Sequence, residues 1–373
     1  MFLLFLLIIF CSNSLLPMES YLSDFGEDFI LRAEVNGKEK CCELGSEFFK
    51  SIYDDTKTLK SDDPDCFKSS FIRDEQKALA KLKELGGESI TVKSKKFQDI
   101  YCTFFDRKSD SLLVVGVGYP VPRYKMLPLA KLFPNYDLLF FDYRGIGADH
   151  HPGKASFLLP WKWKGLLSWY TAKIDFNVSS IGAVEAADVI SVVEYFQNLK
   201  VYRNTFALGF CFSSYVFSEV QKERSLFDKL IFDGSWPSVE RVVKTIIKCP
   251  SLVCSVENPR SPVPCMTYNS CFQSFVVKLF EWAAWVNVKM PPMSEYLSEI
   301  SCPVLFFQSL KDCYCNKEEF EELWSATTSP RVAILTNNLH GRNHVWQAEA
   351  YGKIARYFLE RSYSDFVEGL MDL

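Results

Sequence analysis

Residues 205–213, with the sequence Thr-Phe-Ala-Leu-Gly-Phe-Cys-Phe-Ser, decide the fold prediction for this chain. A short apolar strand is predicted over 205–209, and the residues that follow the segment have the composition of a helix. A turn that joins a strand directly to a helix and displays its central residue needs small residues two positions away on each side. Gly209 and Ser213 occupy those positions. The segment therefore predicts a sharp turn that displays Cys211.

The chain on both sides of this turn alternates between apolar strands and amphipathic helices. Strands are predicted over residues 89–92, 100–105, 112–117, 136–141, 205–209, 229–232, 303–308 and 332–335. Helices are predicted over residues 74–85, 127–133, 214–222 and 317–324, and around the apolar sets Val189, Val192, Val193, Phe196 and Tyr351, Ile354, Ala355, Phe358. This alternation predicts an α/β protein with a mostly parallel, doubly wound sheet. Sites in such sheets lie beyond the carboxyl ends of the strands.

The turn at Cys211 resembles the G-x-S-x-G nucleophile elbow of the α/β-hydrolase superfamily, with Cys as the nucleophile and Ser in place of the last Gly. The family's triad runs in the order nucleophile, acid, histidine. Asp312 follows the strand predicted over 303–308, and His340 follows the strand predicted over 332–335. The resemblance therefore implies the α/β-hydrolase fold, with a Cys-Asp-His triad and a helical cap insertion.

Two upstream segments also resemble family motifs. Residues 142–147, Asp-Tyr-Arg-Gly-Ile-Gly, are similar to a D-x-R-G-x-G turn, in which Asp142 and Arg144 are expected to have a structural role. Residues 118–120, Gly-Tyr-Pro, fall where the oxyanion loop of these hydrolases lies. The resemblance implies that the backbone N–H groups of Tyr119 and Phe212 form the oxyanion hole.

The implied activity is the cleavage of an ester or thioester of a hydrophobic acyl substrate through a covalent acyl-enzyme. In this scheme Cys211 attacks as the thiolate, His340 transfers protons, and Asp312 orients the imidazole. No cofactor or metal is implied. Two other functions stay open: a catalytically inactive binding protein that associates with membranes, and an acyltransferase.

Some assignments have competitors in the sequence. Asp233, which follows the strand predicted over 229–232, competes with Asp312 for the role of the acid. His344 competes with His340, because both lie in the same predicted loop. The adjacent histidines at 150 and 151 are expected on a solvated loop, and a role in the substrate pocket is the alternative.

The chain is expected to divide into a leader, an extension and a hydrolase core interrupted by two insertions. The ranges are 1–17 for an apolar leader, 18–87 for an N-terminal extension, 88–236 for the first part of the core with an aromatic insertion at 150–178, 237–300 for a cap, and 301–373 for the second part of the core. Both insertions are rich in aromatic residues, which suit either an apolar acyl substrate or the core of the cap.

The leader contains an unbroken apolar run over residues 2–10. This run has the length of an export signal but lacks a positively charged start, and it is shorter than the ~20 residues of a spanning helix. It predicts a membrane-associated or exported protein, whereas translation from Met18 would give a cytoplasmic one. The leader and the Phe-rich composition are also similar to hydrolase-like membrane proteins of chlamydiae.

Composition excludes several other classes. The 373 residues carry 42 Lys plus Arg against 46 Asp plus Glu, which argues against a nucleic-acid-binding protein. The 13 cysteines form no C-x-x-C pair and the four histidines complete no zinc-finger spacing, so a metal site is not expected. Cysteines 249, 254, 265 and 271 are either buried thiols or, in an oxidising compartment, disulfide partners.

Overall fold

The computed structural model describes residues 29–35, 38–44, 75–95, 98–119, 121–126, 129–144, 146, 182, 184–248, 269–284, 289–310, 312, 314–337, 340–341, 343–346 and 348–371. The predicted leader, the aromatic insertion at 150–178 and the histidines at 150 and 151 lie outside these residues. So do three of the four cysteines considered for disulfides, at positions 249, 254 and 265. Within the described part, no helix has the length and hydrophobicity needed to cross a membrane.

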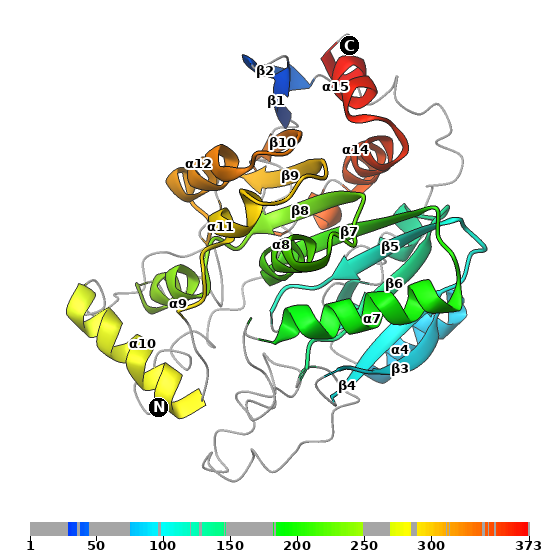
Figure 1. Ribbon diagram of the computed structural model, residues 1–373, viewed down its shortest axis with the longest axis horizontal. Coiled ribbons are helices and arrows are strands. Elements are labelled where there is room, and N and C mark those ends of the chain that lie inside the picture. The colour runs from blue at the N-terminus through cyan, green and yellow to red at the C-terminus, as the bar shows by residue number, and fades with distance from the viewer. Residues whose placement is uncertain are drawn as a thin grey trace.

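The described strands form one ten-stranded sheet. They are β1 (Phe29–Val35), β2 (Lys38–Leu44), β3 (Glu88–Lys93), β4 (Asp99–Phe105), β5 (Ser111–Gly116), β6 (Asp137–Phe141), β7 (Asn204–Cys211), β8 (Lys229–Ser235), β9 (Val304–Ser309) and β10 (Arg331–Thr336). Their order across the sheet is β2-β1-β10-β9-β8-β7-β5-β6-β4-β3 (Figure 1). The six central strands, from β10 to β6, are parallel, and an antiparallel pair extends each edge.

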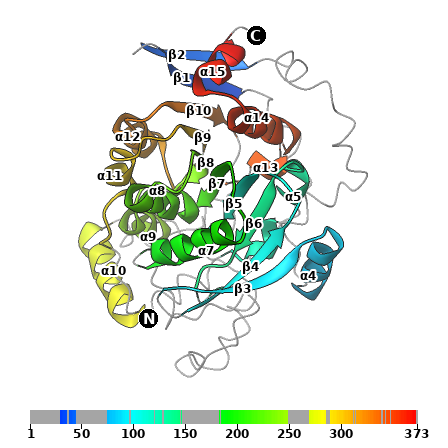
Figure 2. The same ribbon diagram turned by 45° about the vertical axis from the view of Figure 1, so that its right-hand side comes forward.

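Helices cover both faces of this sheet. They are α4 (Glu75–Glu84), the 3₁₀ turn η5 (Arg123–Met126), α5 (Leu129–Leu132), α7 (Glu185–Leu199), α8 (Phe212–Arg224), α9 (Val239–Lys248), α10 (Ser270–Ala284), α11 (Met293–Leu297), α12 (Lys317–Ala326), α13 (Asn343–Trp346), α14 (Ala348–Glu360) and α15 (Tyr363–Met371). Figure 2 shows α7, α8 and α12 on one side of the sheet and α5, α13 and α14 on the other. The predicted mostly parallel, doubly wound α/β architecture is confirmed.

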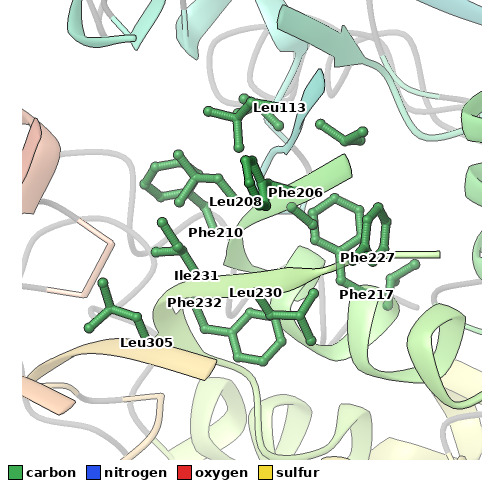
Figure 3. Close-up of a cluster of buried hydrophobic side chains, with 14 of the residues drawn as sticks. Leu113, Phe206, Leu208, Phe210, Phe217, Phe227, Leu230, Ile231, Phe232 and Leu305 are labelled. Carbon is green, nitrogen blue, oxygen red and sulfur yellow. The ribbon is translucent and has the colours of Figure 1, made fainter. Parts of the chain in front are cut away.

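The core lies where the central strands meet α8. Strands β5 to β9 are almost entirely buried, as expected for parallel strands covered on both faces. Figure 3 shows the side chains that fill this region: Leu113, Phe206, Leu208, Phe210, Phe217, Phe227, Leu230, Ile231, Phe232 and Leu305. The phenylalanines therefore pack on both faces of the sheet: Phe217 of α8 contacts Phe227, whereas Phe210 contacts His344 of α13.

The N-terminal extension takes part in the sheet, which the sequence prediction did not anticipate. Strand β1 pairs antiparallel with β10, and β2 pairs with β1 (Figure 1). Arg32 of β1 anchors the hairpin, because its guanidinium bonds to both Glu39 and Glu321 and lies 4.5 Å from the centre of the Trp324 ring. The boundary expected at residue 87 therefore does not separate the extension from the core sheet.

A second difference lies at the C-terminal end of the chain. The predicted final helix is α14, but a further helix, α15, follows it. Ser362 caps this helix by accepting the backbone N–H of Asp365, and Tyr363 donates its hydroxyl to backbone carbonyls at Glu34 and Arg331. Helix α15 thus packs against the strands that join the N-terminal hairpin to the sheet.

Buried ion pairs hold the chain after β6, as expected for the two charged residues of the motif at 142–147. Asp142 accepts the backbone N–H of Arg123 at 2.6 Å and pairs with its guanidinium, which also donates to Thr103. Arg144 forms two hydrogen bonds of 2.6 Å to Asp188 of α7. These pairs fix the turn that follows β6 to η5 and α7.

We expect Asp142→Ala to lower the free energy of unfolding by about 3–5 kcal/mol, because Arg123 would stay buried without its counter-charge. Urea unfolding followed by circular dichroism measures this change. Asp106→Ala is the matched control, since Asp106 pairs with an exposed lysine, Lys108, and should leave the midpoint almost unchanged. Equal midpoints for the two variants would contradict the proposed importance of the buried pair.

Candidate active site

Cys211 occupies a strained turn between β7 and α8. It is the last residue of β7, and α8 begins at the next residue, Phe212. Its backbone angles are φ 53° and ψ −114°, a conformation that costs a non-glycine residue roughly 1–3 kcal/mol. Such strain persists only where the surrounding structure enforces it. The sharp turn predicted from the sequence is therefore present, and Cys211 is its central residue.

The small residues on either side of Cys211 allow β7 and α8 to approach closely. A Cβ atom on Gly209 would lie 2.9 Å from the backbone of Ser213 and Ser214, so only glycine fits there. Ser213, which replaces the second glycine of the motif, donates its hydroxyl to the carbonyl of Val117 at 2.5 Å. Its side chain occupies the space that a Cβ atom on Gly116 would need, at 2.5 Å. A glycine on the neighbouring strand thus makes room for the serine.

Asp312 and His340 lie in contact. Nδ1 of His340 is 2.6 Å from Oδ2 of Asp312, and the carboxylate is fully buried. The other carboxylate oxygen, Oδ1, accepts the backbone N–H groups of Tyr314 and Cys315 at 2.8 and 3.0 Å. Gln308 donates to Oδ2 at 3.2 Å. The loop after β9 therefore holds the carboxylate in one orientation toward the imidazole.

Cys211 lies close enough to His340 to affect its titration. Burial lowers the pKa of His340, but the charges of Asp312 and Cys211, and hydrogen bonds to both, raise it more, so that the pKa lies well above its usual value. Because Nδ1 of His340 is turned toward Asp312, the buried Nε2 is the nitrogen that interacts with Cys211. The pair is therefore arranged to share a proton between the sulfur and Nε2.

The two residues expected to form the oxyanion hole, Phe212 and Tyr119, lie near Cys211. Phe212 is the first residue of α8, where N–H groups have no partner within the helix. Gly118 follows β5, and a Cβ atom there would lie 3.2 Å from Cβ of Cys211. Tyr119 comes next, and its ring lies 5.5 Å from that of Phe212. The loop after β5 thus lies next to Cys211 and the start of α8.

The competing residues lie elsewhere. Asp233 is fully buried at the end of β8, and its Oδ2 is 3.8 Å from Nδ1 of His344. The ring of His344 packs against that of Phe210, with centroids 4.7 Å apart. Asp233 and His344 therefore belong to a separate buried cluster, and the structure pairs His340 with Asp312.

Sequence reasoning missed two residues of the site. Gln308 is a polar residue next to the end of the buried strand β9, a signal that the sequence contains but that does not identify a partner. Gly234 has a φ of 70°, and a Cβ atom there would lie 2.9 Å from the ring of His340. No group of three or more His, Cys, Asp or Glu residues in the described part of the chain is arranged to hold a metal ion.

Comparisons with known proteins identify the fold. No family model and no curated protein sequence matches the chain. Among solved structures, an esterase from Pyrococcus furiosus is similar with a TM-score of 0.55 and 15% identity, over 75% of this chain and 92% of its own. An esterase from Thermogutta terrifontis has a TM-score of 0.49 and 16% identity, over 73% and 98% of the two chains. Together with the strand order and the elbow, the similarity to the P. furiosus enzyme shows that this chain has the α/β-hydrolase fold.

Proposed function

We propose that the protein is a hydrolase that cleaves an ester or thioester of a hydrophobic acyl substrate, with Cys211, His340 and Asp312 as its catalytic residues. The observation that carries the proposal is the position of Cys211, which occupies the strained elbow and faces an imidazole whose other nitrogen is 2.6 Å from a buried carboxylate. A strained nucleophile next to an oriented base is the arrangement that covalent acyl transfer requires.

In the acylation step the sulfur of Cys211 bonds to the carbonyl carbon, and the carbonyl π electrons move to the oxygen. When the tetrahedral intermediate collapses, the bond from carbon to the leaving oxygen or sulfur breaks. His340, protonated by the thiol, gives its proton to that leaving group. Asp312 stabilises the imidazolium and keeps Nδ1 protonated, so that Nε2 is the nitrogen that exchanges protons.

In the deacylation step water attacks the thioester formed on Cys211. His340 takes a proton from this water and returns it to the departing sulfur, which restores the starting state. Because the same acyl-enzyme would form with an acceptor other than water, an acyltransferase remains the second function that this geometry supports. Hydrolysis and acyl transfer differ only in the group that attacks the acyl-enzyme, which is water in the first case and another acceptor in the second.

Stabilisation of the oxyanion is assigned to the N–H groups of Phe212, which follows Cys211 in the chain, and of Tyr119, which follows Gly118. Each donor in such a hole contributes about 2.7–4 kcal/mol to lowering the barrier. The position of Phe212 at the start of α8 adds the positive end of the helix dipole. The side chain of Phe212 is fully buried, so only its backbone is assigned to the reaction.

The apolar character of the acyl group is inferred from aromatic side chains near the reacting groups. The partly buried ring of Tyr314 lies 4.8 Å from the ring of His340, and Tyr119 adjoins Gly118, which contacts Cys211. Leu310, in the same loop as Asp312, is about half exposed. Apolar and aromatic groups next to the imidazole and next to Gly118 favour a hydrophobic acyl chain over a charged one.

We expect Cys211→Ala to abolish covalent acylation and to lower turnover by about 10⁴-fold or more, because the attacking atom is removed. The experiment incubates the chain with 4-nitrophenyl esters and acyl thioesters of increasing chain length. It records the intact mass and the release of the leaving group. The wild type should gain one acyl group per chain, and longer acyl chains should react faster.

Cys271→Ala is the matched control for this experiment, because Cys271 is an exposed free thiol on α10 far along the chain from the elbow. It should behave as the wild type. Equal labelling of Cys211→Ala and the wild type would mean that another thiol reacts and that the assigned nucleophile is wrong. A wild type that is neither acylated nor able to turn over any ester would contradict the proposed hydrolase.

We expect Asp312→Asn to lower the pKa of His340, because the charge of Asp312 and its hydrogen bond both raise that pKa in the wild type. The proton on His340 would then be lost at a lower pH. NMR titration of the histidine Cε1 protons measures this directly, since the chain has only four histidines and a His340→Gln spectrum assigns the resonance. An unchanged titration would show that Asp312 is not the orienting carboxylate.

A further inference from the structure

The loop that carries His340 is closed at its base by a buried hydrogen bond. This loop runs from Thr336, the last residue of β10, to Asn343, the first residue of α13. The hydroxyl of Thr336 donates to Oδ1 of Asn343 at 2.8 Å, and both residues are 1% exposed. The two ends of the loop are therefore joined by a bond that water does not reach.

Asn343 also joins the loop to a different strand. Its Nδ2 donates to Oδ1 of Asp233 at 2.8 Å, and Asp233 belongs to β8 and is fully buried. Strand β8 is not adjacent to β10, because β9 lies between them. The side chains of Thr336, Asn343 and Asp233 thus form a chain of hydrogen bonds, named here the loop clamp, that spans three neighbouring strands.

The end of β8 contacts the imidazole as well as the base of its loop. Gly234 follows Asp233, and a Cβ atom on Gly234 would lie 2.9 Å from both Cε1 and Nδ1 of His340 and from the backbone nitrogen of Gly341. The same strand pairs with β7, where Ser235 lies opposite Cys211. Strand β8 therefore lies between the strands that lead to the nucleophile and to the base, and its end contacts the imidazole.

The buried carboxylate of Asp233 lowers the stability of the fold unless its partners compensate for the loss of water. Transfer of an ionised group out of water costs several kcal/mol unless partners compensate, and apolar side chains of similar size are often at least as stabilising. The charge of Asp233 also reaches Tyr351, where burial and that charge raise the pKa of the hydroxyl. Hydrogen bonds are directional, so they fix one arrangement of the residues that they join, which apolar packing does not do.

We infer that Asp233 and Asn343 are positioning residues, which fix the distance between His340 and Cys211 by clamping the histidine loop to β8. This inference rests on the proposed function, because the distance between His340 and Cys211 affects a rate only if the two residues catalyse the reaction. Asp233 does not act as the triad acid, because Asp312 bonds to His340 and Asp233 bonds to the base of the loop. A displacement of about 1 Å at a reacting group lowers the rate by about 10²-fold.

The test compares Asn343→Ala with the paired exchange Asp233→Asn plus Asn343→Asp. The single variant should reduce the rate of Cys211 acylation by about 10²-fold with KM almost unchanged, because binding groups stay in place. It should also lower the pKa of His340, since contacts with Asp312 and Cys211 loosen. In the paired exchange, the amide at position 233 donates to the carboxylate at position 343, and that carboxylate can still accept the hydroxyl of Thr336. The exchange should therefore restore both the acylation rate and the pKa of His340.

If Asn343→Ala does not fold, Thr336→Val replaces it in the test. This substitution removes only the hydroxyl group and keeps the shape of the buried side chain. It should shift the same two readouts in the same direction, by less. Thermal unfolding of each variant separates loss of stability from loss of position. A folded Asn343→Ala or Thr336→Val protein with wild-type acylation and wild-type His340 titration would overturn the inference, as would an exchange that restores neither readout.

The titration also separates this inference from the proposed function. If the wild type does not react with any ester, the proposed function fails. The NMR titration of His340 still reports whether the clamp sets the environment of the imidazole. If the wild type reacts and the variants titrate and react as it does, the clamp alone is wrong.

Discussion

The site depends on one backbone conformation, the positive φ of Cys211 at the end of β7. That conformation exists because Gly209 lets α8 pass within van der Waals contact of the strand, and because Gly116 on β5 leaves space for Ser213. A side chain at either glycine would collide with the first turn of α8. The strain at a single residue is thus maintained by packing across two strands and a helix.

The order of the strands brings the three proposed catalytic residues together, although they lie far apart in the sequence. Strands β7, β8, β9 and β10 are consecutive in the parallel part of the sheet, so the residues beyond their carboxyl ends meet at one edge. Cys211 comes from β7, Asp312 from the loop after β9 and His340 from the loop after β10. Strand β8 supplies no member of the proposed triad, but its end lies against the imidazole and bonds to the loop that carries it.

Much of this was predictable because the central strands are apolar runs and the elbow has a recognisable pattern. The pairing of Asp312 with His340 agrees with the order expected from the family. The N-terminal hairpin was not found, because β2 begins with three charged residues, Lys38, Glu39 and Lys40, and shows no alternation of apolar and polar residues. The bond between Asp233 and Asn343 joins residues far apart in the sequence, and no local pattern encodes such a contact.

The hairpin of β1 and β2 protects this protein from self-association through the edge of its sheet. Strand β10 would otherwise be an edge of the sheet, with a row of N–H and C=O groups ready to pair with any extended chain. Strand β1 occupies that row, and the outermost strand β2 exposes charged side chains to solvent. A chain shortened to begin at residue 88, where the sequence predicts the start of the core, would therefore expose the unpaired edge of β10 and self-associate.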